Sequence, residues 1–179
     1  MNSVVTCHIR RLAAALLLAL PAAAPTAAPA AAPTPVAVFD LELYDTSLEG
    51  EMRGPDPAED ARLAQITGLL RDAVAARPDM TTVDVAPLHD RLAAMPALYS
   101  CSGCEAKLAG ELGAERSVSG FVYKVSTLVI YISVAVRDTA SGQLLEQANV
   151  SIRGNTDGSW RHGMQTLLDR RLFKPVRQQ

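Results

Sequence analysis

The sequence has no long run of basic residues, and its charges nearly balance. The 179 residues include 17 Lys and Arg against 19 Asp and Glu, which gives a formal net charge of -2. Proteins that bind nucleic acid through the phosphate backbone normally show a basic patch or stripe. We therefore expect no nucleic-acid partner.

Long apolar runs are missing as well. A membrane-spanning helix needs about 20 consecutive apolar residues, and no run in this sequence approaches that length. The hydrophobic fraction of 49% and the charged fraction of 20% are typical of a globular protein. The length suits one domain with a tail, and we expect no membrane span.

Catalytic signatures are also absent. The motifs of serine hydrolases, P-loop proteins and dinucleotide-binding proteins do not occur. The Cys-x-x-Cys pair at Cys101 and Cys104 is followed by Glu105 instead of histidine, which excludes covalent haem attachment. We predict a non-enzymatic protein without a cofactor.

The first 30 residues have the pattern of an export signal. Arg10-Arg11 precede a short apolar run over residues 12–20, and small residues follow. This order is typical of a cleaved secretory signal peptide, and it places the protein in the periplasm. We expect cleavage after Ala30, because the earlier Ala-x-Ala sites would leave proline at the new N-terminus. The predicted organisation is a signal peptide over 1–30, a flexible lead-in over 31–35 and a single α+β domain over 36–175.

Strand and helix patterns alternate along the mature chain. Apolar residues at every second position indicate strands, and apolar spacings of three and four indicate helices. The predicted order is β-α-β-α-α-β-β-β-α. We expect strands over residues 36–43, 81–85, 117–125, 128–137 and 144–153, and helices over 57–77, 87–95, 104–112 and 157–172.

The connections between these elements determine the topology. Right-handed crossovers place the second strand on one side of the first strand and the third strand on the other. The last three strands form a meander that continues outward. The predicted fold class is therefore α+β, with one mixed five-stranded sheet in the order 2-1-3-4-5 and helices packed on it.

Two capping boxes are predicted at helix starts. Asp56 and Glu59 bracket the first turn of one helix, and Ser102 and Glu105 bracket the first turn of another. In such a box the acidic side chain bonds back to the backbone of the N-cap residue. Both glutamates are thus expected to serve helix ends.

Several segments resemble known bacterial families. Four segments are similar to the N-terminal domain of TolB and to the periplasmic domain of curli-secretion lipoproteins. They are the Val-Ala-Val-Phe-Asp strand, the helix with Cys-x-x-Cys, the Leu-Gly-Ala-Glu step and the Arg-Asp-Thr-Ala-Ser-Gly-Gln-Leu-Leu hairpin. The chain resembles more closely a family of small secreted bacterial proteins known as a domain of unknown function. That resemblance is carried by residues 39–43, 45–50 and 153–157 and by Trp160. It implies the fold and no catalytic residue.

Cys101 and Cys104 are the cysteines of the mature chain. In the oxidising periplasm they are expected to form a short disulfide, since a structural bond is favoured over a redox-active one. The redox alternative rests on the position of Cys104 in a first helical turn, where the helix dipole lowers a thiol pKa. Zinc would need further ligands, and His89 and His162 stand alone in the sequence.

An acidic string follows the first strand. Its clustered carboxylates could attract a hard cation such as calcium, although no EF-hand spacing occurs and such runs are usually solvated loops. Asp40 and Glu42 are expected to share one face of the strand. The string consists of Asp40, Glu42, Asp45, Glu49 and Glu51.

The topology brings two polar loops to one edge of the sheet. The carboxyl ends of the first and last strands point the same way, and the N-terminus of the helix at Cys104 is expected beside them. Ligands of open α/β sheets favour that edge. The alternative is structural, with Arg153 pairing to Asp45 or Glu49 to pin the loop. The predicted recognition surface comprises Asp45, Thr46, Ser47, Glu49, Arg153, Asn155 and Asp157.

We favour a non-enzymatic periplasmic binding or assembly module that acts through contacts with another periplasmic protein. The alternative is an accessory protein of a periplasmic quinone-cofactor dehydrogenase system that binds a small molecule or metal. A thiol-disulfide enzyme is the least favoured hypothesis. The oligomeric state stays open.

Overall fold

The structure is a computed structural model that describes residues 32–173. The predicted signal peptide and its cleavage site lie outside the described residues. The strands are β1 (Thr34–Val38), β2 (Glu42–Asp45), β3 (Met80–Val83), β4 (Arg116–Ser126), β5 (Val129–Asp138) and β6 (Leu144–Ile152). The helices are α1 (Leu48–Arg53), α2 (Pro57–Ala75), α3 (His89–Ala93), α4 (Cys104–Glu111) and α5 (Asp157–Arg170), with 3-10 turns η1 (Ala86–Leu88) and η2 (Leu98–Ser100).

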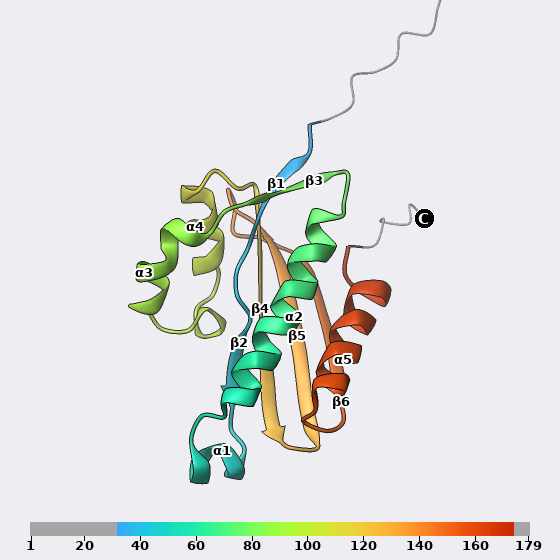
Figure 1. Cartoon of the computed structure of the whole chain (residues 1–179). Helices are drawn as coiled ribbons and strands as arrows, with labels where there is room; N and C mark the ends of the chain where they lie inside the picture. Colours follow the sequence, from blue (N-terminus) through green and yellow to red (C-terminus); the bar gives the residue numbers. More distant parts are fainter. Residues whose placement is uncertain (1–31, 174–179) are drawn as a thin grey trace, which may run out of the picture. The chain divides into compact units, whose positions relative to one another are not determined.

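All six strands belong to one mixed sheet. Its order is β3-β1-β4-β5-β6, with β2 paired to β4 beyond the end of β1 (Figure 1). β1 runs parallel to β3 and β4, and β4, β5 and β6 form an antiparallel meander. The predicted fold class and strand order 2-1-3-4-5 are therefore confirmed.

The first predicted strand is interrupted. Residues 36–43 divide between β1 and β2, and both pieces pair with β4. Val38 lies opposite Val118 and Glu42 lies opposite Phe121. Four steps along the β1–β2 segment therefore match three steps along β4. This extra residue is a β-bulge, and it exchanges the faces on which successive side chains lie.

Hydrogen bonds and close packing hold the bulge in place. The Leu41 amide donates to the Thr67 hydroxyl of α2 at 3.1 Å. A Cβ added to Gly120 of β4 would overlap the Ser133 carbonyl oxygen of β5 and meet the Leu41 side chain at 2.8 Å, so β4 needs a glycine at this position. Asp40, inside the bulge, is exposed and pairs with Arg71 at 2.9 Å. The expectation that Asp40 shares a strand face with Glu42 is therefore wrong.

The lead-in predicted over residues 31–35 is wrong at its end, because Thr34 and Pro35 are the first residues of β1. The Thr34 amide donates to the Asp79 carbonyl at 2.9 Å. Thr34 and Pro35 lie opposite Met80 and Thr81 of β3. Pro35 is tolerated because it stands at the start of the strand, one residue before β1 begins to pair with β4 at Val36. Its carbonyl accepts from the Glu115 amide at 2.8 Å.

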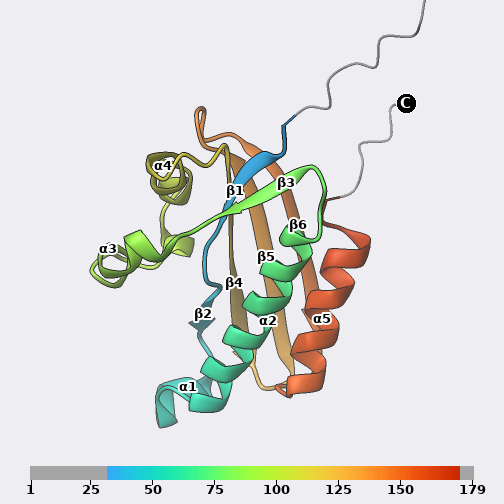
Figure 2. The ribbon, with the colours of Figure 1, turned by 45° about the horizontal axis from the view of Figure 1, so that its top comes forward.

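Helices α2 and α5 lie side by side on one face of the sheet, as both ribbon views show (Figures 1 and 2). The larger core fills the space between them and the sheet. It is built from alternate residues of the strands and from the apolar stripes of the two helices. Its largest fully buried members include Ile66, Leu70, Ile130, Ile132, Trp160, Met164 and Leu167.

A second, smaller core lies on the opposite face of the sheet. There α3, α4 and η2 cover β1 and the first half of β4, with Phe39 completely buried among them. Beyond this cover, the same face of β5 and β6 is open, and Gln147, Asn149 and Ser151 are exposed on it. The two faces of the sheet are thus very different surfaces.

The cap of α2 agrees with the sequence only in part. Asp56 is the N-cap and accepts from the Ala58 amide at 2.9 Å, as predicted. Glu59 is not the second half of a capping box, because its carboxylate is buried and contacts Lys124 of the sheet. The capping pattern located the helix start correctly and assigned Glu59 the wrong role.

The predicted box at Ser102 and Glu105 is also wrong. The N-cap of α4 is Gly103, whose φ of 88° favours glycine, and it provides no side-chain cap. Glu105 is buried and pairs with Arg137 of β5 at 2.9 Å. At α5 the N-cap is Thr156, which forms a reciprocal box with Ser159.

Gly163 allows α5 to approach the sheet closely. A Cβ there would overlap the Ile152 side chain and meet Ile132 at 3.1 Å. We expect Gly163→Ala to lower the free energy of unfolding by about 1–3 kcal/mol through overpacking. Gly158→Ala in the same helix meets nothing within 4 Å and should raise it by up to about 1 kcal/mol. Urea unfolding of both variants measures the difference, and equal effects would contradict this packing account.

Candidate functional site

A buried ammonium group organises the carboxyl end of the parallel strands. The side chain of Lys124 on β4 is only 3% exposed. Its Nζ lies 3.0 Å from Asp45 Oδ2, 2.6 Å from Glu59 Oε1 and 3.9 Å from Glu49 Oε2. The contacts therefore join β4 to β2, α2 and α1 around one cation.

The same cluster continues toward α5. Asn155, in the loop between β6 and α5, donates through Nδ2 to Glu59. The Asn155 Oδ1 accepts from Trp160 Nε1 at 2.9 Å and from Arg62 Nη1 at 3.3 Å. Arg62 also pairs with Asp157 at 2.8 Å. Two loops distant in sequence are thus joined by a chain of polar contacts, which we call the Lys124 network.

Hydrogen bonds fix the charge states in this network. Burial acts to raise the pKa of the Asp45 carboxyl, but hydrogen bonds from Ser47 and Lys124 outweigh it and lower the pKa below 3.8. Burial acts to lower the pKa of Lys124, but contacts with Glu59 and Asp45 raise it above 10.5. The stabilisation from Asp45 is therefore present above pH 3.8 and is lost in stronger acid, whereas that from Lys124 is lost only in strong base.

The structure brings most of the predicted recognition residues to one edge. Asp45, Glu49, Asn155 and Asp157 all join the Lys124 network or its Arg62 extension. The cation that holds Asp45 is Lys124, and the predicted alternative of an Arg153 pair is replaced by it.

Three other predicted residues have separate positions. Ser47 is buried and caps α1 by accepting from the Gly50 amide, while Thr46 is exposed and its hydroxyl donates to the Lys124 carbonyl. Arg153 is exposed. The role of this edge in recognition stays a prediction.

The acidic string does not form one cluster. Asp40 pairs with Arg71, and Asp45 and Glu49 face Lys124. Glu42 lies on the opposite face of the sheet, where it accepts from two backbone amides of η2. With its members turned to different partners, the string does not present the convergent oxygen ligands that calcium needs.

Sequence reasoning missed a row of aromatic rings on the open face of the sheet. Ring centroids are 5.1 Å apart between Tyr44 and Tyr99, 5.0 Å between Tyr44 and Tyr123, and 6.2 Å between Tyr123 and Tyr131. Phe121 lies 5.6 Å from Tyr99. We call these five residues the aromatic strip, which includes all four tyrosines of the chain.

The aromatic strip crosses β2, β4 and β5 and is only partly covered. Tyr44 and Tyr131 are each 41% exposed, and Tyr99 is 38% exposed. The spacing of Phe121 and Tyr123 two residues apart was the available signal, since it places both rings on one strand face. Tyr44 could not be added to that face from sequence, because the bulge reverses its orientation.

A hollow of about 730 Å³ opens where the strip meets the end of the sheet. Tyr44 and Tyr99 form part of its wall, and the rest comes from β2, α1, the start of α2 and the short loops that join them. Its charged lining residues are all acidic, namely Asp45, Glu51, Glu59 and Asp60. Aromatic and acidic chemistry therefore meet in one concave site.

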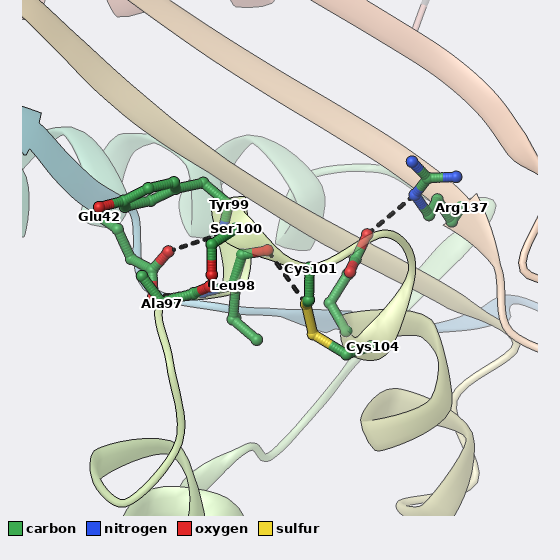
Figure 3. Close-up of a disulfide and its surroundings, with 9 residues drawn as sticks. Glu42, Ala97, Leu98, Tyr99, Ser100, Cys101, Cys104 and Arg137 are labelled. Carbon is green, nitrogen blue, oxygen red and sulfur yellow. Dashed lines mark hydrogen bonds and ion pairs between the residues drawn. A yellow bond between two sulfur atoms is a disulfide. The ribbon is translucent and has the colours of Figure 1, made fainter.

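The segment that carries Tyr99 is attached to β2 and leads into the Cys101–Cys104 pair. The structure pairs Cys101 with Cys104 directly after η2 (Figure 3). Glu42 accepts from the Leu98 and Tyr99 amides at 2.9 and 3.0 Å, which attaches η2 to β2. Cys101 lies near the middle of β4, so the start of α4 is not at the loop edge where the sequence placed it.

The one group of potential metal ligands in the described part of the chain is already engaged in other contacts. Among residues 32–173, Cys101, Cys104 and Glu105 are the group whose donor atoms lie close enough together to hold an ion. The two sulfur atoms are bonded to each other and Glu105 pairs with Arg137. No helix in the described part of the chain is long and apolar enough to cross a membrane.

Comparison with known proteins agrees with the family expected from the sequence. Residues 34–172 match the family model DUF3280, described as "Protein of unknown function (DUF2380)", and the chain belongs to this family. Comparison with curated proteins gives no match. The likeness to TolB and to curli-secretion lipoproteins stays a prediction.

Several solved structures are similar in fold. The LpoB C-terminal domain from Escherichia coli is 14% identical with a TM-score of 0.47, covering 70% of this chain and 87% of that one. Lipoprotein GNA1162 from Neisseria meningitidis is 16% identical, with a TM-score of 0.45 and coverage of 70% and 84%. The PelC dodecamer from Paraburkholderia phytofirmans is 18% identical, with a TM-score of 0.39 and coverage of 80% and 89%. At these values the similarities carry no functional conclusion.

Removal of the Lys124 ammonium group should strongly destabilise the protein. Lys124→Met leaves the buried Glu59 carboxylate without its cation, so the free energy of unfolding should fall by about 3–5 kcal/mol. Adding Glu59→Gln should recover part of the loss, because the neutral amide tolerates burial better. Chemical denaturation at pH 7 measures both variants. Lys107→Met on the exposed side of α4 is the matched control, and an equal loss there would refute the prediction.

Oxidation of Cys101 and Cys104 in the exported protein stays a prediction. Mass spectrometry without reduction should show the mature protein two hydrogen atoms lighter than its dithiol form. Replacing both residues with serine should cost only about 2 kcal/mol, because the closed loop is short, and should leave the circular dichroism spectrum unchanged. Free thiols in freshly isolated periplasmic protein would contradict this.

Proposed function

We propose that this protein is a non-enzymatic binding module of the periplasm that acts through contacts with another protein. The observation that carries the proposal is the aromatic strip. It offers a row of partly exposed rings on a sheet face that its own helices leave open.

The distribution of aromatic residues between the core and the surface supports this proposal. Phe39 and Trp160 are completely buried, so the fold has room for large rings in its cores. The four tyrosines are instead gathered on the open face. Tyrosine is enriched at protein interfaces because it provides a large contact area with few rotatable bonds and a polar tip.

Contacts on the helix-covered face of the sheet and at η2 also hold the aromatic strip rigidly. Asp45 follows Tyr44 directly and is bound to Lys124 on the other face of the sheet, which fixes β2. Tyr99 is fixed by the contact of its backbone amide with the Glu42 carboxylate. A surface ordered before binding loses less conformational entropy on association, and this favours recognition.

Site-specific photo-crosslinking in living cells tests the proposal. A benzophenone amino acid replaces Tyr44 or Tyr131 in the exported protein, and Arg161 on the exposed side of α5 is the control position. We expect both strip positions to give one shared protein adduct that the control does not give. No adduct, or the same adducts at Arg161, would overturn the proposal.

Binding of the purified partner provides the quantitative test. Tyr44→Ser and Tyr131→Ser should each weaken binding by about tenfold or more, which corresponds to about 1.4 kcal/mol. The exposed Arg161→Ser should leave the dissociation constant unchanged. Calorimetry measures the constants, and circular dichroism shows whether each variant keeps its fold.

A further inference from the structure

The aromatic strip changes character where it reaches the hollow. Over β5 and β6 the open face carries neutral side chains such as Ser133, Gln147 and Asn149. At the other end Tyr44 and Tyr99 border carboxylates from α1 and α2. A partner that lies along the strip therefore meets the carboxylates of the hollow at this end.

The negative charge in the hollow is not neutralised from within. Lys124 is the one ammonium group that Asp45, Glu49 and Glu59 face, so the carboxylates around it outnumber it. Glu51 and Asp60 are exposed and add two more. The hollow thus has the electrostatic character of a site for a cation.

The aromatic walls distinguish between kinds of cation. A hydrated metal ion gains little from tyrosine rings, whereas a guanidinium group stacks on an aromatic face and binds carboxylates through paired hydrogen bonds. Aromatic rings and carboxylates occur here in one concavity, and this combination suits arginine better than calcium.

We infer that the partner inserts an arginine side chain of a basic segment into this hollow, against Tyr44 and Tyr99 and toward Glu51 and Asp60. The inference rests on the proposed function, since the rest of the segment lies along the aromatic strip. Continuity between hollow and strip favours a protein segment over a lipid headgroup, which would occupy the hollow alone.

Titration of the isotope-labelled mature protein with N-acetyl-arginine amide tests the inference. We expect amide chemical shifts to change around Tyr44, Gly50 and Tyr99, with weak saturable binding. N-acetyl-citrulline amide has nearly the same shape without the charge, and it should bind at least about fivefold more weakly. Equal binding of the two compounds would overturn the inference.

Choline chloride and calcium chloride identify the other possible occupants. Tighter binding of choline at the same residues would assign the hollow to a quaternary ammonium headgroup, and tighter binding of calcium would assign it to a metal. Either result overturns the arginine assignment.

Charge variants give the second readout. Glu51→Gln combined with Asp60→Asn should weaken arginine binding by about fivefold or more. Asp90→Asn combined with Asp169→Asn removes the same charge from exposed sites on α3 and α5 and should have no effect. Equal weakening by both pairs would show that only net charge matters, which contradicts a defined site.

The two proposals fail in different ways. If crosslinks form from Tyr131 while arginine does not bind the hollow, the docking function stands and the arginine assignment falls. If no crosslinks form from the strip, the docking function itself falls, whatever the titration shows.

Discussion

One buried ammonium group determines how the end of this sheet is arranged. Lys124 lies inside the protein, where an unpaired charge would be strongly destabilising, so neighbouring elements must supply carboxylates to it. β2, α1 and α2 each provide one. Through Glu59 and Asn155 the same requirement reaches Trp160 at the base of α5. The helix layer and the loops are therefore positioned by the same contacts.

The aromatic strip and the Lys124 network are two consequences of the same alternation. In β2 and β4, Asp45 and Lys124 point toward the helices, and their neighbours Tyr44 and Tyr123 point to the open face. An ion pair on one face thus fixes stacked rings on the other. The aromatic strip gains rigidity from polar contacts on the opposite face of the sheet.

Much of the fold could be predicted from the sequence, because period-two apolar patterns and right-handed crossovers determine the order of the strands. The edge where Asp45 and Asn155 meet followed from that order. The roles of single side chains did not follow. Glu59 fits a capping pattern, and only the position of Lys124 across the core explains why it turns inward. The strip was missed because Tyr99 reaches it from a distant segment, and because the bulge changes the face of Tyr44.

The bulge at residues 39–41 gives this short segment an unusual evolutionary constraint. Its amino acids could change within limits, but its length could not. Deleting one residue would turn β2 over, placing a tyrosine against Lys124 and a carboxylate among the exposed rings. Insertions and deletions in related proteins should therefore occur in the loops before β1 and after β2, while the number of residues between β1 and β2 stays constant.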